Sequence, residues 1–173
     1  MPWQQRRARR GEDPAERSAD PAGARARALA LLTGRDYASA ELYEKLCAHF
    51  TPEAAAGTVA ALVEAGLVDD QRYAEAKARS LRRARKSRLA AALALRGKGL
   101  TDGQIDAALE AAYAPGEAGE DPELEAARAL VAGPYRAKLD AGRRDLVAAA
   151  LARRGFPHRV IRQALDAPDG EEA

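Results

Sequence analysis

Alanine is the residue that most limits what this chain can fold into. It accounts for 44 of the 173 residues and for more than half of the 47% that are hydrophobic. Alanine costs the least free energy in a helix and gives a β-sheet little side chain to pack, and aromatic residues make up only 5% of the chain. We therefore predict an all-α protein of thin, closely packed helix layers, and neither a sandwich nor a barrel.

The chain repeats a pattern that suits a helix end, a tight turn and a helix start. Gly99-Leu100-Thr101 and, 56 residues later, Gly155-Phe156-Pro157 are each followed by apolar residues at the same spacing, and Phe50-Thr51-Pro52 begins a looser copy. The two glycines suit the left-handed position that follows a helix. Thr101 with Gln104 is typical of a capping box, and Asp121 before a proline suits a helix start. We expect helices near residues 24–33, 39–49, 52–65, 70–84, 87–97, 102–113, 122–139, 142–154 and 157–166.

These helices group into three units of three helices. Units of this size that bury little by themselves usually stack in a row, so we predict tandem three-helix repeats in an elongated, curved body. The residues before the first helix are rich in charge and proline without a helical period, which is typical of a disordered tail. The expected organisation is a disordered tail at 1–23, repeats at 24–69 and 70–114, a linker at 115–121, a third repeat at 122–167 and a frayed acidic end at 168–173.

No residue pattern indicates an enzyme, a metal site or a cofactor. Cys47 and His49 are two residues apart, which points their side chains away from each other on a helix, and His158 is the only other histidine. We interpret Cys47 as a small buried apolar residue, and we expect no catalysis and no cofactor. A single cysteine cannot form an intramolecular disulfide and fits a reducing compartment. Without a run of 18 apolar residues or a signal peptide, we expect a cytoplasmic protein that binds no membrane.

Basic residues gather in the middle of the chain. Between Arg72 and Lys98 there are ten basic residues and one acidic residue, a local net charge of +9, although the whole chain carries only +2. Such a row of arginine repels itself unless something anionic lies opposite, either a nucleic-acid backbone or an acidic protein groove. A merely solvated helix face is the alternative. No aromatic residues alternate with the arginines, which argues against base stacking on single strands.

Three short motifs follow one another along these repeats. They are Gly66–Ala74 with its Asp-Asp pair and following tyrosine, Leu95–Leu100 with Arg-Gly-Lys-Gly, and Leu151–Phe156 with Arg-Arg-Gly. In order and spacing they resemble the signatures of the RecX family of recombination regulators, from about residue 24 to residue 167. Two features depart from the family pattern: Lys86–Leu89 replaces a Gly-Pro-Arg-Arg-like helix start, and the segment before residue 24 has no counterpart.

The resemblance implies a non-enzymatic modulator in DNA recombination, repair and the SOS response. Members of the family bind RecA recombinase filaments on DNA and usually inhibit strand exchange and the filament's ATPase. We interpret Asp69 and Asp70 as caps of the helix near 70, and Tyr73 as a core residue. We expect a monomer that contacts the filament, and the DNA backbone without sequence preference, through one basic surface formed by Arg79, Arg82, Arg83, Arg85, Lys86, Arg88, Lys98, Arg143, Arg144, Arg153 and Arg154.

Two other functions fit the residues. One is a stand-alone DNA-binding helical regulator, which the basic residues of the last repeat, such as Arg159 and Arg162, would serve. The other is a helical scaffold for a different acidic protein. Binding to DNA alone would show a steep dependence on salt, because each neutralised phosphate releases a counterion.

Overall fold

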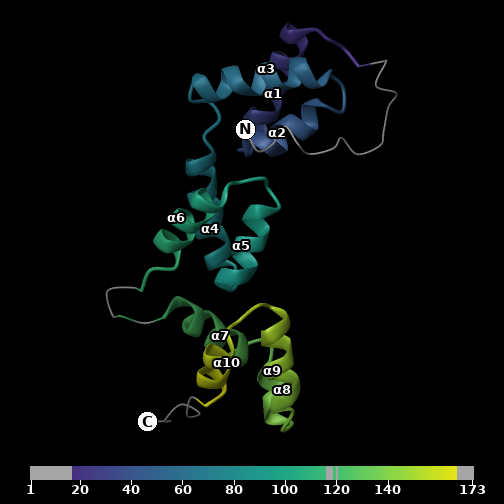
Figure 1. The fold of residues 1–173 in the computed structure, drawn as a ribbon. Helices are drawn as coiled ribbons and strands as arrows, with labels where there is room; N and C mark the ends of the chain where they lie inside the picture. The colour runs from purple at the N-terminus through teal and green to yellow at the C-terminus, as the bar shows by residue number, and fades with distance from the viewer. Residues whose placement is uncertain (1–16, 116–118, 120, 167–173) are drawn as a thin grey trace. The chain divides into compact units, whose positions relative to one another are not determined.

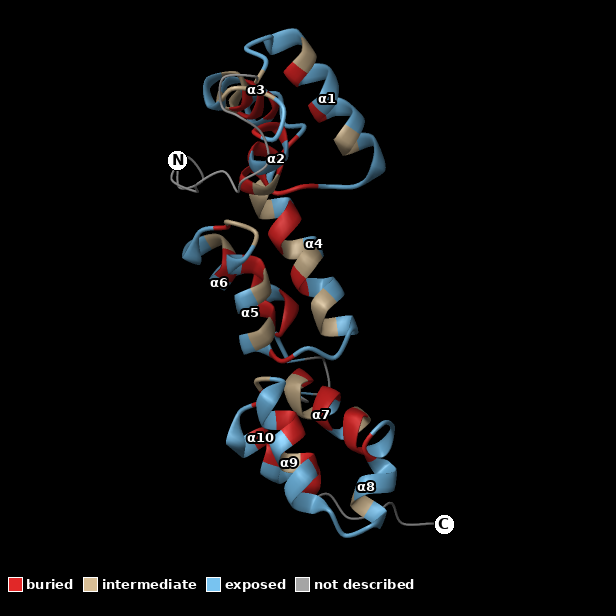
Figure 2. Ribbon diagram, turned by 90° about the vertical axis from the view of Figure 1, so that its right-hand side faces the viewer, coloured by how far each residue is buried: buried red, intermediate tan, exposed pale blue. Residues whose placement is uncertain are grey.

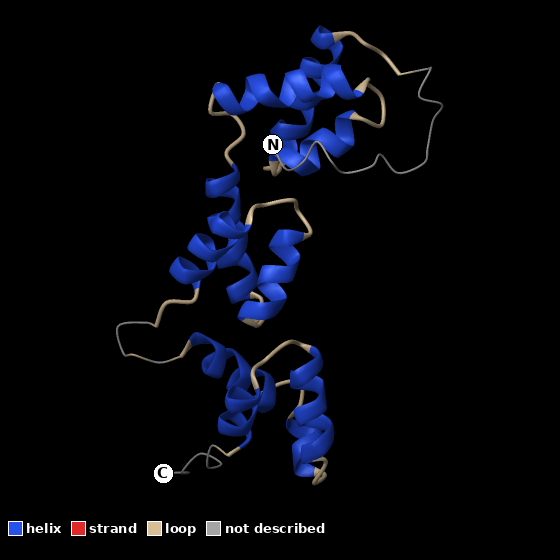
Figure 3. Ribbon diagram, viewed as in Figure 1, coloured by secondary structure: helices blue, strands red, loops and turns tan. Residues whose placement is uncertain are grey.

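The structure is a computed structural model that describes residues 17–115, 119 and 121–166. Every regular element in these residues is a helix (Figure 3), which confirms the predicted all-α class. The elements, in chain order, are α1 (Pro21–Gly34), α2 (Ser39–Leu46), α3 (Pro52–Glu64), α4 (Asp70–Arg83), α5 (Arg88–Arg96), α6 (Asp102–Ala112), α7 (Pro122–Ala132), α8 (Arg136–Asp140), α9 (Arg144–Arg153) and α10 (His158–Leu165).

The predicted caps and turns are confirmed at the residues that motivated them. Thr101 Oγ1 accepts from the Gln104 N–H at 3.3 Å, and Gln104 Oε1 accepts from the Thr101 N–H at 2.9 Å, so the capping box is complete. Thr51 caps α3 and Asp121 caps α7, each before a proline. Gly99 has a φ of 80° and Gly155 a φ of 83°, so both occupy the left-handed region after a helix.

The first helix begins earlier than predicted. Asp20 accepts backbone hydrogen bonds from Ala22 and Gly23, and α1 starts at Pro21. Ser18 also exchanges backbone hydrogen bonds with His49 and Thr51. The folded part of the chain therefore includes the end of the predicted tail, since an Asp-Pro pair starts a helix here as it does at α7. The rest of that tail (1–16) and the acidic end (167–173) lie outside the described residues.

The helix predicted over 122–139 is wrong, because it is two helices. α7 ends at Ala132 and α8 begins at Arg136, with Gly133 and Pro134 between them. Proline has no N–H to continue the helical ladder and disfavours helical backbone in the residue before it. The Leu130 carbonyl, which would accept from residue 134, instead accepts from the Tyr135 N–H at 3.1 Å.

The two aspartates of the Asp-Asp pair cap two different helices. Asp69 Oδ1 accepts from the Arg72 N–H at 2.9 Å and so caps α4, as predicted. Asp70, which we expected to cap the same helix, instead accepts from the Ser39 N–H at 2.7 Å and from Ser39 Oγ at 2.5 Å. Ser39 is the first residue of α2, so Asp70 joins the starts of two helices that are 31 residues apart in sequence.

The chain divides into two compact units. One contains the residues up to Ala74 together with Leu95–Ile105, and the other contains Glu75–Ala94 together with the residues from Asp106 onward. In the first unit α1, α2 and α3 lie against one another (Figure 1), around a core that includes Leu42, Leu46 and Leu62. The division into three repeats stays a prediction.

The second unit has its own core. α10 lies against α7 and α9, and the buried sides of these helices (red in Figure 2) meet around Val147, Leu151 and Val160, all fully buried. Tyr135 and Phe156 join the same cluster from the turns. The elements that carry most of the predicted binding residues therefore stand on an apolar base.

Candidate functional site

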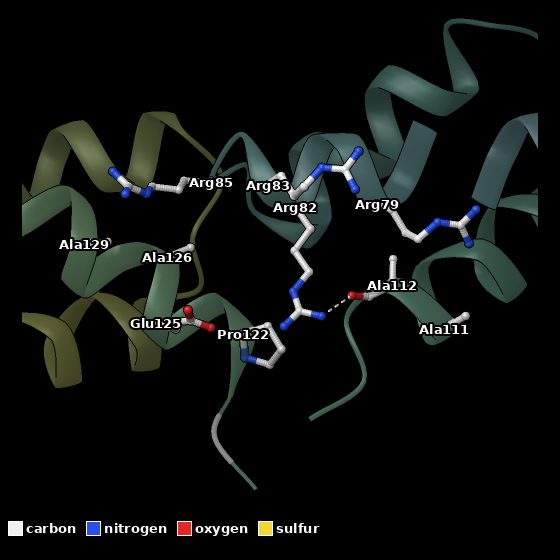
Figure 4. Close-up of a pocket in the computed structure, with 10 residues that line it drawn as sticks. All are labelled: Arg79, Arg82, Arg83, Arg85, Ala111, Ala112, Pro122, Glu125, Ala126 and Ala129. Carbon is white, nitrogen blue, oxygen red and sulfur yellow. Dashed lines mark hydrogen bonds between the residues drawn. The ribbon is translucent and has the colours of Figure 1, made fainter. Parts of the chain in front are cut away.

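Four of the predicted arginines surround one cavity in the second unit. Arg79, Arg82 and Arg83 lie on α4 at helical spacing, and Arg85 follows in the turn before α5 (Figure 4). The cavity has a volume of about 500 Å³. Its other residues come from the end of α6 and from α7, and they are Ala111, Ala112, Pro122, Glu125, Ala126 and Ala129.

The cavity is strongly cationic. Within the described residues, Arg83 and Arg85 form no ion pair, and the single carboxylate that lines the cavity belongs to Glu125. Arg79 lies 3.8 Å from Glu75, with 54% of its side chain exposed. Guanidinium groups bind phosphates and carboxylates through paired N–H donors, so the cavity suits an anionic group. No aromatic residue lines it, so it offers nothing on which a base could stack.

Arg85 holds an unusual backbone conformation. Its φ is 54°, and it is the one residue other than glycine with a positive φ in the described part of the chain. It occupies the position after α4, where the Lys86 N–H returns to the Leu81 carbonyl at 3.1 Å, and glycine is the usual residue there. A left-handed conformation costs a residue with a side chain about 1–2 kcal/mol. Strain of this kind at a cavity is typical of a functional position.

Arg82 differs from its neighbours because it has a structural partner. Its Nη1 donates to the Ala112 carbonyl at 3.0 Å, which satisfies a free carbonyl at the end of α6 (Figure 4). Close by, the Tyr113 hydroxyl donates to the Lys86 carbonyl at 2.9 Å. Burial, helped by the negative charge of Glu123, raises the pKa of Tyr113 to about 12, so this donor keeps its proton at neutral pH. These two bonds join the ends of α4 and α6.

A second basic group lies where the start of α5 meets the end of α9. Ser87 is fully buried; its Oγ donates to the Arg154 carbonyl at 2.8 Å and accepts from the Ala90 N–H at 3.1 Å. This contact brings the exposed Lys86 and Arg88 beside the basic pair at the end of α9. The guanidinium of Arg154 lies 5.6 Å from the centre of the Tyr135 ring, whereas Arg153 is exposed.

Two other predicted residues of this unit have carboxylate neighbours. Arg144 donates to the Leu165 carbonyl at 3.0 Å and forms an ion pair with Asp166. Arg143 lies 3.8 Å from Asp145. Both attractions leave these cations less available to an anionic partner than Arg83 and Arg85.

Lys98, in the first unit, is part of a small ionic network. Its Nζ lies 2.9 Å from Glu41 Oε1, which also accepts from Arg35 at 2.8 Å. Burial alone would raise the pKa of Glu41, but the hydrogen bonds and charges of Lys98 and Arg35 outweigh it and lower this pKa. Lys98 thereby ties the turn before α6 to α2. That all eleven cations share one surface stays a prediction.

Comparison with known proteins identifies the family. The second three-helix domain of RecX matches residues 69–109. The regulatory protein RecX of Streptomyces coelicolor is 38% identical over 176 residues, which cover 96% of this chain and 88% of the relative. The protein of the same name from Trichlorobacter lovleyi is 39% identical over 143 residues, covering 79% of this chain and 89% of the relative. This chain belongs to the RecX family.

The fold agrees with solved RecX structures. A crystal structure of regulatory protein RecX superposes with a TM-score of 0.72 at 24% identity, covering 84% of this chain and 71% of the other. RecX from Lactobacillus salivarius gives a TM-score of 0.70 at 19% identity, covering 86% and 96%. The resemblance predicted from the three motifs is confirmed, and the RecX relatives above are named as regulatory proteins.

Several features of this RecX chain had no signal in the sequence. The alanines of α6 and α7 that face the arginines, and the pairing of Lys98 with Glu41 across 57 residues, depend on how distant segments meet. The positive φ of Arg85 also depends on context, because glycine is the residue that normally marks such a turn.

Other chemistry finds little support in the described part of this RecX chain. Burial raises the pKa of the Cys47 thiol, which opposes formation of the reactive thiolate. No group of three or more His, Cys, Asp or Glu side chains there could hold a metal ion. Among the described helices none has the length and apolar character needed to cross a membrane.

Proposed function

We propose that this protein binds RecA recombinase filaments on DNA in the cytoplasm and inhibits their ATPase, strand exchange and growth, without catalysing a reaction itself. Membership of the RecX family supports this role. The observation that carries the proposal is the arginine-lined cavity of the second unit, where Arg83 and Arg85 have no ion pair in the described chain and Arg85 keeps a strained backbone.

Inhibition follows from binding a filament in one arrangement. A RecA filament on DNA is a polyanion, because the phosphates of the bound strand add to the acidic groups of the protein. A protein whose guanidinium groups bind these anions stabilises the filament states that present them together, and so slows the states through which ATP hydrolysis and subunit addition pass. Since the cavity has no aromatic lining, we expect contacts to phosphates or carboxylates without preference for base sequence.

The test is the ATPase of RecA on single-stranded DNA with this protein at substoichiometric amounts. We expect a lower rate and shorter filaments by electron microscopy. Inhibition at far fewer molecules than RecA subunits would indicate binding at the growing end, whereas inhibition in proportion to coverage would indicate binding along the groove. An unchanged rate together with unchanged filament length would refute the proposal.

The cavity itself is tested with Arg83→Glu/Arg85→Glu. We expect this double variant to need at least about tenfold more protein for half-inhibition, because it places two negative charges where the anion binds. Arg25→Glu/Arg27→Glu, which changes two exposed arginines of α1 by the same charge, is the matched control. Arg82 is left unchanged because it caps α6. Equal inhibition by the cavity variant and the control would contradict the placement of the site.

A salt titration without RecA tests the alternative of a stand-alone DNA-binding regulator. On duplex DNA the logarithm of the affinity falls with the logarithm of salt concentration by about 0.9 for each phosphate neutralised. Tight DNA binding with a slope of several phosphates, together with no effect on RecA, would favour the alternative.

A further inference from the structure

Two large apolar side chains lie exposed one turn apart on α5. Leu89 and Leu93 each have 57% of their surface accessible, the highest values among the exposed large hydrophobic residues in the described chain. The opposite side of the same helix is buried at Ala91. A leucine left half in water forgoes much of the roughly 1.5–3 kcal/mol that its full burial would contribute. The core of this unit therefore does not account for these two leucines.

Basic residues surround this apolar pair. Lys86 and Arg88 stand at the start of α5, beside Leu89. A Cβ built on Gly155 would lie 3.5 Å from the Leu89 Cβ, so the turn after α9, with Arg153 just before it, borders the pair. Within the described residues, Lys86, Arg88 and Arg153 form no ion pair. The result is an apolar centre with a cationic rim, all within one unit.

We propose that this leucine-centred surface of α5 docks an acidic segment of a partner protein that carries an apolar side chain between its carboxylates. The centre matches the anatomy of protein interfaces, where apolar anchors lie inside a polar rim. A sugar-phosphate backbone has no apolar group to cover two leucines, and a second copy of this chain would bring the same positive rim against itself. The inference rests on the proposed function, in which the partner is the RecA protein of the filament.

This surface and the arginine-lined cavity have different partners. The cavity presents guanidinium groups over alanine and suits phosphate or carboxylate alone, whereas the α5 surface requires apolar contact. Removing the leucines should therefore weaken binding to the filament without weakening binding to naked DNA.

The experiment compares Leu89→Ala/Leu93→Ala with Val63→Ala/Leu67→Ala, which shortens two exposed apolar residues of the first unit. Alanine keeps the helix, and the circular dichroism of each variant is measured first. Affinity is then measured for RecA filaments on labelled single-stranded DNA and for the same DNA without RecA. We expect the leucine variant to lose at least about tenfold in filament affinity, the typical effect of removing interface anchors. Its DNA affinity and the control should change less than about twofold. A second variant, Leu93→Gln, should lie between.

The outcomes separate the two proposals. If the wild-type protein binds the filament and the leucine variant binds it equally well, the docking surface is refuted and the proposed function stands. If the leucine variant loses affinity for naked DNA to the same extent, the leucines act on nucleic acid and the protein-docking inference is overturned. If the wild-type protein does not bind the filament at all, the proposed function is refuted and the docking surface loses its partner.

Discussion

Gly155, in the turn between α9 and α10, offers a direct measure of how the second unit is held together. Its φ is +83°, and an added Cβ would lie 2.8 Å from Ser87 Oγ. An alanine in this conformation costs about 1–2 kcal/mol, of which about 0.4–1 kcal/mol is offset because alanine restricts the unfolded chain. The contact adds to this, since Ser87 is buried and cannot move without weakening its bonds to Ala90 and Arg154, each worth about 1 kcal/mol. We expect Gly155→Ala to destabilise the unit by about 2–3 kcal/mol.

The matched control is Gly142→Ala, which lies in the same unit. Its φ is +71°, but nothing lies within 4 Å of its added Cβ, so it should cost only about 0.5–1 kcal/mol. In a Ser87→Ala background the nearest remaining atoms to a Cβ at Gly155 are 3.5 Å away, an ordinary contact, so the extra cost should disappear. Urea unfolding followed by circular dichroism gives these values as a double-mutant cycle. Equal costs for the two glycine variants, or an undiminished cost without the Ser87 hydroxyl, would refute the reasoning.

Three further outcomes can be checked. Arg85→Gly should raise the free energy of unfolding by about 0.5–1 kcal/mol, because it relieves a positive φ, yet weaken inhibition of RecA; a stability loss in denaturant melts would contradict this. Asp70→Ala should cost about 2–3 kcal/mol because it leaves the Ser39 N–H and hydroxyl without their acceptor, against about 1 kcal/mol for Asp69→Ala, which removes a single cap bond. The pKa of Glu41 is lowered in the folded protein, so its contribution to stability is complete above the unfolded value near 4.5 and is lost as pH falls through the lower folded value. Glu41→Gln should therefore destabilise at pH 7 and match the wild type more closely at pH 3, as thermal melts at the two pH values would show; an equal difference at both would count against the ionic network.

The binding residues divide according to whether their surroundings could be predicted. That basic residues of α4 and the turn after it would gather was visible in the local count of charges, and the cavity brings Arg79, Arg82, Arg83 and Arg85 together. Which of them are available to a partner was not visible. Arg82 is held by a carbonyl 30 residues away, and Lys98 by a carboxylate 57 residues away.

The sequence alone determined the helices, most of their ends and the family, because these depend on neighbours along the chain. Alanine content, a Thr-x-x-Gln box and a glycine after a helix act over one or two turns, so the pattern of Gly99–Gln104 predicts its own structure. The break at Gly133-Pro134 is equally local and could have been predicted from its proline.

Tertiary structure alone decided the partners of the polar groups. Asp70 could cap its own helix as well as Asp69 does, and it caps α2 because the fold brings the Ser39 N–H within 2.7 Å. Ser87 likewise bonds Arg154, 67 residues away. Sequence separation carries no information about such meetings, since a hydrogen bond forms with whichever group the packed helices present. The same packing decides which charges remain for a partner.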